Sequence, residues 1–151
     1  MYSVYSVYSV YSAYSSAEYC SVVWHNKLTQ AQSKAIERFQ IVGIKIILGN
    51  DCPKKEDGQV DYLAALALCQ LDPLILRRNN RVLSFGKKCI KHPSLKRLFP
   101  INPAIYEDPH HVRNRELFQV NHARTLAYQN LAIPAIQCRL NQFYSYSPPS
   151  T

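Results

Sequence analysis

The segment LILRRNNRVLSFGKKCIKHPSLKRLF, residues 74–99, predicts a helix with a basic face and an apolar face. At about 100° per residue, the basic side of this helix carries Arg77, Arg81, Lys88 and Lys91, and the apolar side carries Ile75, Val82, Leu83, Cys89 and Ile90. Asp72 can cap the first backbone N–H groups, Pro73 suits the first helical position, and Pro93 predicts the end. We expect the apolar side to pack on the helix predicted over residues 30–48.

The basic residues of this segment have no acidic neighbours in the sequence. The predicted nucleic-acid-binding set is Arg77, Arg78, Arg81, Lys87, Lys88, Lys91, Lys96 and Arg97, with no Asp or Glu among them. A solvated helix face docked on a small core explains any one of these charges. The whole cluster fits equally well a surface that follows nucleic-acid phosphates.

The charge of the chain is distributed unevenly along its 151 residues. The net charge is +8, with −1 in residues 1–76 and +9 in residues 77–151. A difference of this kind between two halves indicates nucleic acid or another anionic surface as partner. A chain of this length has room for one hydrophobic core.

The cysteines and apolar runs favour an intracellular location. The five cysteines are irregularly spaced, and the sequence shows no secretory signal peptide, so we expect reduced thiols in the cytoplasm or nucleus. The longest apolar run, residues 41–48, is far shorter than the roughly 20 residues of a membrane span. Cys89 and His92 lack the second ligand pair of a zinc finger, so we expect no metal site.

The strongest helix signal after the basic segment covers residues 30–48. Thr29 and Gln32 have the spacing of a capping box, and Gly49 suits the helix end. Its apolar stripe predicts the main core element of the fold; the stripe consists of Leu28, Ala35, Ile36, Phe39, Val42, Gly43, Ile46 and Ile47. Trp24, in a short aromatic segment before this helix, is predicted to be core.

The remaining segments complete a mainly α, small irregular helical domain. Residues 1–16 are a low-complexity Tyr-Ser-Val repeat, 17–100 a helical region, 101–143 a C-terminal segment and 144–151 a disordered tail. Asp61 caps a helix predicted over 62–70, and Pro134 precedes one predicted over 135–141. Residues 110–130 fit a helix interrupted by an extended piece, which the alternation of Phe118 and Val120 supports.

The sequence contains no recognisable motif for two-metal catalysis or for a phosphate-binding loop. Two-metal polymerases and nucleases need carboxylates held together, but the adjacent acids Glu56-Asp57 and Glu107-Asp108 stand in proline- and charge-rich loops. The glycines are scattered, so they form no phosphate-cradling loop. We therefore predict no catalytic residue, no cofactor and no small-molecule substrate.

An ordered series of segments nevertheless resembles a known family. EYCSVVWHNKLTQAQSKAIERFQIVGIKIILG, LCQLDPLILRRNNRVLSFGKKCIKHP, RLFP, HHVRNRELFQVNHART and IPAIQCRLN are similar to the C-terminal region of the reverse transcriptase polyprotein of non-LTR (LINE-type) retrotransposons. The resemblance covers roughly residues 18–141. It implies a helical thumb and post-thumb region, downstream of the catalytic palm.

The resemblance implies a function without catalysis. The palm and its metal-binding aspartates are missing, and the tyrosine repeat stands where the family continues upstream, so we expect a truncated fragment that does not polymerise DNA alone. The family's thumb packs against template and primer, which implies RNA or DNA binding through the phosphate backbone. The alternative is an inert or protein-interaction helical module. The oligomeric state is not predicted.

Overall fold

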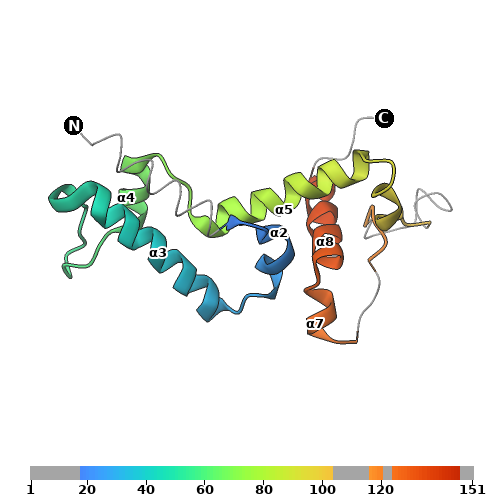
Figure 1. Ribbon diagram of the computed structural model, residues 1–151, viewed down its shortest axis with the longest axis horizontal. Helices are drawn as coiled ribbons and strands as arrows, with labels where there is room; N and C mark the ends of the chain where they lie inside the picture. Colours follow the sequence, from blue (N-terminus) through green and yellow to red (C-terminus); the bar gives the residue numbers. More distant parts are fainter. Residues whose placement is uncertain (1–17, 104–115, 121–123, 147–151) are drawn as a thin grey trace. The chain divides into compact units, whose positions relative to one another are not determined.

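The computed structural model describes residues 18–103, 116–120 and 124–146, which form a mainly α-helical protein (Figure 1). The elements in chain order are α2 Ser21–Trp24, η1 His25–Lys27, α3 Gln30–Leu48, η2 Gly49–Asp51, α4 Tyr62–Cys69, α5 Leu74–Lys91, η3 Lys96–Leu98, α7 Leu126–Gln129 and α8 Ala132–Tyr146. The predicted tyrosine repeat, much of the predicted mixed stretch 110–130 and residues 147–151 lie outside the described residues.

The chain divides into two compact units. Unit 1 contains residues 1–21 and 28–79, and unit 2 contains residues 22–27 and 80–151. The boundary between the units falls inside α5, between residues 79 and 80, whereas the predicted boundary between the helical region and the C-terminal segment lies after residue 100. Residues 80–100 therefore group with the C-terminal part of the chain.

Local signals place α3 where the sequence predicts it. The Thr29 hydroxyl accepts from the backbone N–H of Gln32 at 3.2 Å, and the Gln32 side chain accepts from the Thr29 N–H at 2.9 Å, which completes the predicted capping box. Gly49 ends the helix with a φ of +53°, in the region that favours glycine. The predicted cap and end of α3 are both confirmed.

The buried face of α3 differs from the predicted apolar stripe. Gln40, Ile44 and Leu48 are buried, and the last two pack with Ala65 and Leu66 of α4. The predicted core positions Phe39, Val42 and Ile46 are instead exposed. The stripe prediction is therefore wrong at these three positions, whereas Ile36 and Ile47 of the same stripe pack against Leu74. The reason for the difference is that Gln40 faces the interior of unit 1, where it forms hydrogen bonds with the start of α5.

Polar side chains of α3 hold the start of α5. The backbone N–H groups of Leu74 and Ile75 donate to the Glu37 carboxylate at 3.2 and 2.6 Å, and Leu74 also donates to the Gln40 amide oxygen at 3.1 Å. The Gln40 amide donates in turn to the Asp72 carbonyl at 3.0 Å. The first turn of α5 is thus capped by α3, and the prediction that the Asp72 side chain caps it is wrong.

The apolar side of α5 packs mainly within unit 2. Val82 and Cys89 are buried with residues of later segments, among them Phe118 and residues of α8, and Leu83 and Ile90 pack against this core. Only the first residue of α5, Leu74, packs on Ile36 and Ile47 of α3, and the predicted core residue Ile75 is 44% exposed. The predicted packing of this side on α3 is therefore wrong beyond the first turn.

Helix α8 passes very close to α5. A Cβ placed on Gly86 lies 2.6 Å from Cγ2 of Ile136 and 3.1 Å from Cδ1 of Leu140, so this glycine allows the close approach of the two helices. Helix α8 is longer at both ends than the predicted helix 135–141, and it contains the first residues of the predicted disordered tail. Pro134 lies in its first turn, where the missing N–H costs no helical hydrogen bond.

Asn141 of α8 fixes the segment before α7. Its side-chain oxygen accepts from the Phe118 N–H at 2.7 Å, and its side-chain nitrogen donates to the Phe118 carbonyl at 2.9 Å. Phe118 also forms an antiparallel bridge with Ile101, as the predicted extended piece requires. Trp24, predicted as core, is only half-buried.

Candidate nucleic-acid interface

The predicted binding residues are divided between the two units. Arg77 and Arg78 belong to unit 1, and the other six belong to unit 2. Their surroundings separate them into residues committed to the fold and residues exposed to solvent.

Arg78 is a core residue of unit 1. Its side chain is completely buried, and its Nη2 atom lies 3.6 Å from Glu37 Oε1 and 3.2 Å from the Ser33 hydroxyl. Burial lowers the pKa of the Arg78 guanidinium, and the nearby Glu37 carboxylate opposes that shift. The prediction that Arg78 binds phosphates is wrong, because a phosphate has no access to it.

Arg77 is also paired with an acid. Its Nε atom lies 3.0 Å from Oε1 of Glu18, and its Nη2 atom donates to Oε2 at 3.2 Å. The Glu18 side chain is completely buried and that of Arg77 is 22% exposed, so this two-point contact anchors the segment before α2. Arg77 is therefore neutralised within unit 1.

Both acids come from parts of the chain that are distant in sequence. Glu18 is 59 residues before Arg77, and Glu37 reaches Arg78 from α3. A local reading of the basic segment cannot find them. One weak signal is present in the sequence: Glu37 is the only acidic residue of α3. The buried guanidinium of Arg78 accounts for this carboxylate.

Lys87 contacts a ring of α8. Its Nζ atom lies 3.4 Å from the centroid of the Phe143 ring, and its side chain is half-buried. This geometry is a cation–π contact, worth about 0.5–1 kcal/mol near a surface. Lys87 thus contributes to the packing of α5 on α8 while keeping its charge.

The five remaining predicted residues are exposed side chains of unit 2: Arg81, Lys88, Lys91, Lys96 and Arg97. Lys88 and Lys91 are three residues apart on α5, so they share one face. His92 follows, and its carbonyl accepts from the N–H groups of Leu95 and Lys96 at 3.1 and 2.9 Å. A short turn therefore places η3 directly after the last turn of α5. We call the four exposed basic residues of that last turn and of η3 the basic end: Lys88, Lys91, Lys96 and Arg97.

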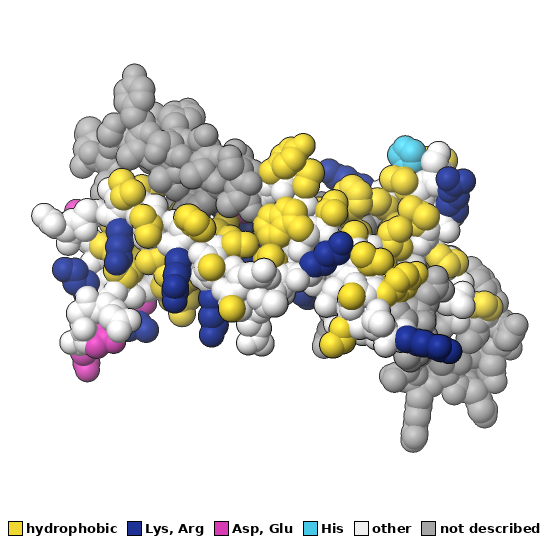
Figure 2. Space-filling model, turned by 60° about the horizontal axis from the view of Figure 1, so that its bottom comes forward, with side chains coloured by type: hydrophobic (Ala, Val, Ile, Leu, Met, Phe, Trp, Pro, Cys, Tyr) yellow, Lys and Arg dark blue, Asp and Glu magenta, His cyan; other side chains and the backbone are white. Residues whose placement is uncertain are grey.

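Few carboxylates accompany these residues. In the described part of unit 2 the only acid is Glu116, and it lies near Cys138, whose pKa is raised by burial and by this carboxylate. None of the basic-end residues forms an ion pair with a described residue. On the face drawn in Figure 2, the side chains over the end of α5 are blue, cyan and yellow, without magenta.

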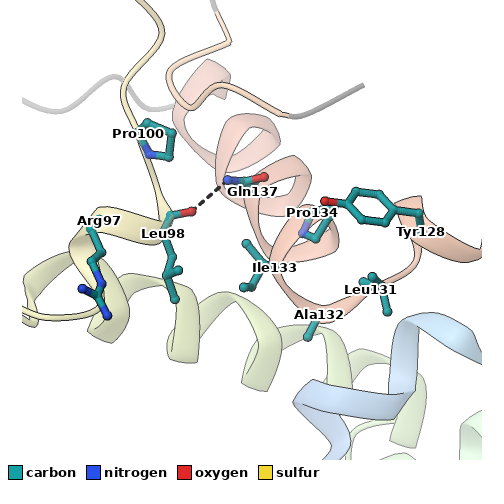
Figure 3. Close-up of a pocket in the computed structure, with 9 residues that line it drawn as sticks. All are labelled: Arg97, Leu98, Pro100, Tyr128, Leu131, Ala132, Ile133, Pro134 and Gln137. Carbon is teal, nitrogen blue, oxygen red and sulfur yellow. Dashed lines mark hydrogen bonds between the residues drawn. The ribbon is translucent and has the colours of Figure 1, made fainter. Parts of the chain in front are cut away.

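A pocket of about 520 Å³ adjoins Arg97 (Figure 3). Its apolar lining comes from η3, α8 and the segments beside them: Leu98, Pro100, Leu131, Ala132, Ile133 and Pro134. Arg97, Tyr128 and Gln137 complete it, and Gln137 donates from its side-chain nitrogen to the Leu98 carbonyl at 3.0 Å. The sequence indicated none of this pocket, because it joins residues about 40 positions apart.

Two other kinds of site are missing from the described residues. In residues 18–103, 116–120 and 124–146, no three His, Cys, Asp or Glu side chains are grouped so that they can hold a metal ion. No helix among the same residues combines the length and hydropathy that a membrane span requires.

Comparison with other proteins gives no further assignment. No protein-family model, curated protein or solved structure matches the chain.

Proposed function

We propose that this protein is a non-catalytic nucleic-acid-binding chain that contacts the phosphate backbone of RNA or DNA through the basic end of unit 2. The resemblance to the C-terminal region of non-LTR retrotransposon reverse transcriptases supports this proposal, as does the position of that region downstream of the palm. The observation that carries it is the exposure of Lys88, Lys91, Lys96 and Arg97 within ten residues, without an ion-paired acid among the described residues.

Binding through phosphate contacts should depend strongly on salt concentration. Each neutralised phosphate releases counterions, so the logarithm of the binding constant falls with the logarithm of salt concentration by about 0.9 per contact on duplex DNA and about 0.7 on a single strand. Four contacts predict a slope of roughly −3 to −4. Arg77 and Arg78 should add nothing to this slope because Glu18 and Glu37 neutralise them.

The test is filter binding over a salt series, with a variant in which the four basic-end residues become Gln. The matched control replaces four exposed lysines of unit 1 by Gln, which gives the same change in net charge; these are Lys34, Lys45, Lys54 and Lys55. We expect the basic-end variant to lose most of the slope and the control to keep it. Equal losses in both variants would show that only net charge matters, and a flat response of the unchanged protein would refute the proposal.

A second candidate function is a protein-interaction module, favoured by the apolar stripe of α3. Phe39, Val42 and Ile46 are 73%, 54% and 72% exposed and recur at helical spacing on one side of α3. A stripe of this kind fits the apolar face of a partner helix. If α3 binds a partner helix in this way, the double variant Phe39→Ser, Ile46→Ser should abolish association with the partner, measured by sedimentation. The same variant should leave RNA binding unchanged.

A further inference from the structure

The pocket beside Arg97 combines an apolar cavity with a cation, and this combination suggests a ligand. We propose that the pocket accepts an unpaired base of a single-stranded nucleic acid, while Arg97 and Lys96 hold the adjoining phosphates. The inference rests on the proposed phosphate binding and names the form of nucleic acid that the same surface prefers.

The walls of the pocket suit the flat faces of a base. Leu98 and Ile133 are 38% and 39% exposed, and Tyr128 is 44% exposed, so apolar and aromatic surface is open to a ligand. Figure 3 shows Tyr128 and Arg97 on opposite sides of the apolar residues. Bases in single strands stack on aromatic side chains, so a base can stack on Tyr128 while Arg97 lies at the other end of the pocket (Figure 3). The volume lies within the range of small-ligand pockets.

The pocket wall is held in place before any ligand binds. The hydrogen bond from Gln137 to the Leu98 carbonyl fastens η3 to α8, and Gln137 is itself almost completely buried. Leu98, Arg97 and Lys96 are consecutive residues of η3, so the same hydrogen bond fixes both an apolar wall and the neighbouring charges. This wall is therefore ordered before binding, so a ligand does not have to supply the entropy cost of ordering it.

The charges select among ligands that carry an apolar group. With one acid in the described part of unit 2, the surface next to the pocket favours an anion. A nucleotide joins a planar base to a phosphate in a single unit, which matches an apolar cavity beside η3. In a duplex the bases are paired and stacked, so only an unpaired base can enter a side pocket. These features favour a single strand over a duplex.

The experiment compares three labelled probes by fluorescence anisotropy. One is a single-stranded RNA of about 12 nucleotides, within the site sizes of single-strand binding folds. The second is an abasic strand with the same number of phosphates, and the third is a duplex of the same length. We expect the RNA strand to bind roughly 5- to 150-fold more tightly than the abasic strand, the usual contribution of one stacked base. This comparison needs no variant.

Variants then locate the base. Tyr128→Ala should remove the preference for the strand with bases and leave binding to the abasic strand unchanged, whereas Tyr128→Phe, which keeps the ring, should retain the preference. Replacing Lys88 and Lys91 by Gln should weaken binding to all probes alike, because these residues lie on α5 outside the pocket lining.

The outcomes separate this inference from the proposed function. Equal binding of the RNA and abasic strands, or a preference that survives Tyr128→Ala, would overturn the base pocket and leave phosphate binding standing. Absence of binding to every probe would overturn both. An acidic aromatic peptide that displaces the strand at a lower concentration than unlabelled RNA would also overturn the inference, because the pocket would then be a peptide site.

Discussion

Gly86→Ala is a demanding test of the packing of α5 on α8. In an exposed helix this substitution stabilises by about 1 kcal/mol, because alanine has the higher helix propensity. In unit 2 the added methyl group lies 2.6 Å from Ile136 Cγ2 and 3.1 and 3.2 Å from two atoms of Leu140. The Ile136 atom is a γ-carbon of a β-branched side chain, which is stiff at χ1, so the contact is relieved only by moving α8.

The expected magnitude follows from these two opposing effects. Overpacking a well-packed site costs about 1–3 kcal/mol, and three atoms must move here. Subtracting the helix-propensity gain of about 1 kcal/mol leaves a net destabilisation of about 0–2 kcal/mol, and the 2.6 Å contact with Ile136 places the expected value in the upper part of this range. The measurement is the free energy of unfolding from urea denaturation followed by circular dichroism.

The matched control is Ser84→Ala, an exposed position of the same helix. It should be neutral or slightly stabilising, because alanine improves the helix there without touching α8. In an Ile136→Ala background, which removes Cγ2, the cost of Gly86→Ala should fall, so the two changes are coupled. A Gly86→Ala protein as stable as the Ser84→Ala protein would refute the close approach of the two helices.

Three further predictions address other contacts of the fold. Asn141→Ala should lower the free energy of unfolding by roughly 2–4 kcal/mol, because it leaves the buried N–H and carbonyl of Phe118 without their partners; urea denaturation checks this. Thr29→Ala should lower the melting temperature, because it removes an N-cap that contributes about 1 kcal/mol to stability. An unchanged melting temperature would show that the cap does not stabilise the protein. Burial raises the pKa of the Cys89 thiol, so the unfolded chain ionises first and stability should fall as the pH rises above about 8.5. Mass spectrometry should then find Cys89 alkylated more slowly than the exposed Cys20 in the folded protein but not in urea.

The sequence predicts the helices of this protein well where the signal is local. The capping box at Thr29, the Asp61 cap and the glycine at residue 49 each act within four residues, and each is found as predicted. The end of α5 before Pro93 has the same local origin. Hydrogen bonds within one turn are readable from spacing alone, so the mainly α character follows from the sequence.

The faces of the helices were harder to predict because they depend on distant partners. Hydrophobic periodicity favoured Phe39 and Ile46 as core, but the structure buries Gln40 because the start of α5 needs its amide. Arg77 and Arg78 likewise form ion pairs with acids that are distant in sequence, Glu18 and Glu37, so they are not available on the surface as the basic pattern suggested. The exposure of the basic end agrees with the sequence pattern, since no described acid pairs with these four residues. The pocket depends on the approach of α8 to η3 and has no local signal.

The dependence of α5 on α3 has a consequence for synthesis of the chain. The acceptors for the first N–H groups of α5 lie 34 to 38 residues upstream, and translation delivers the N-terminal part first. The residues of α3 therefore leave the ribosome before Leu74, so Glu37 and Gln40 are available as acceptors when α5 emerges. We expect α5 to start at a fixed residue during translation, and a circular permutant that makes α5 before α3 to fold more slowly.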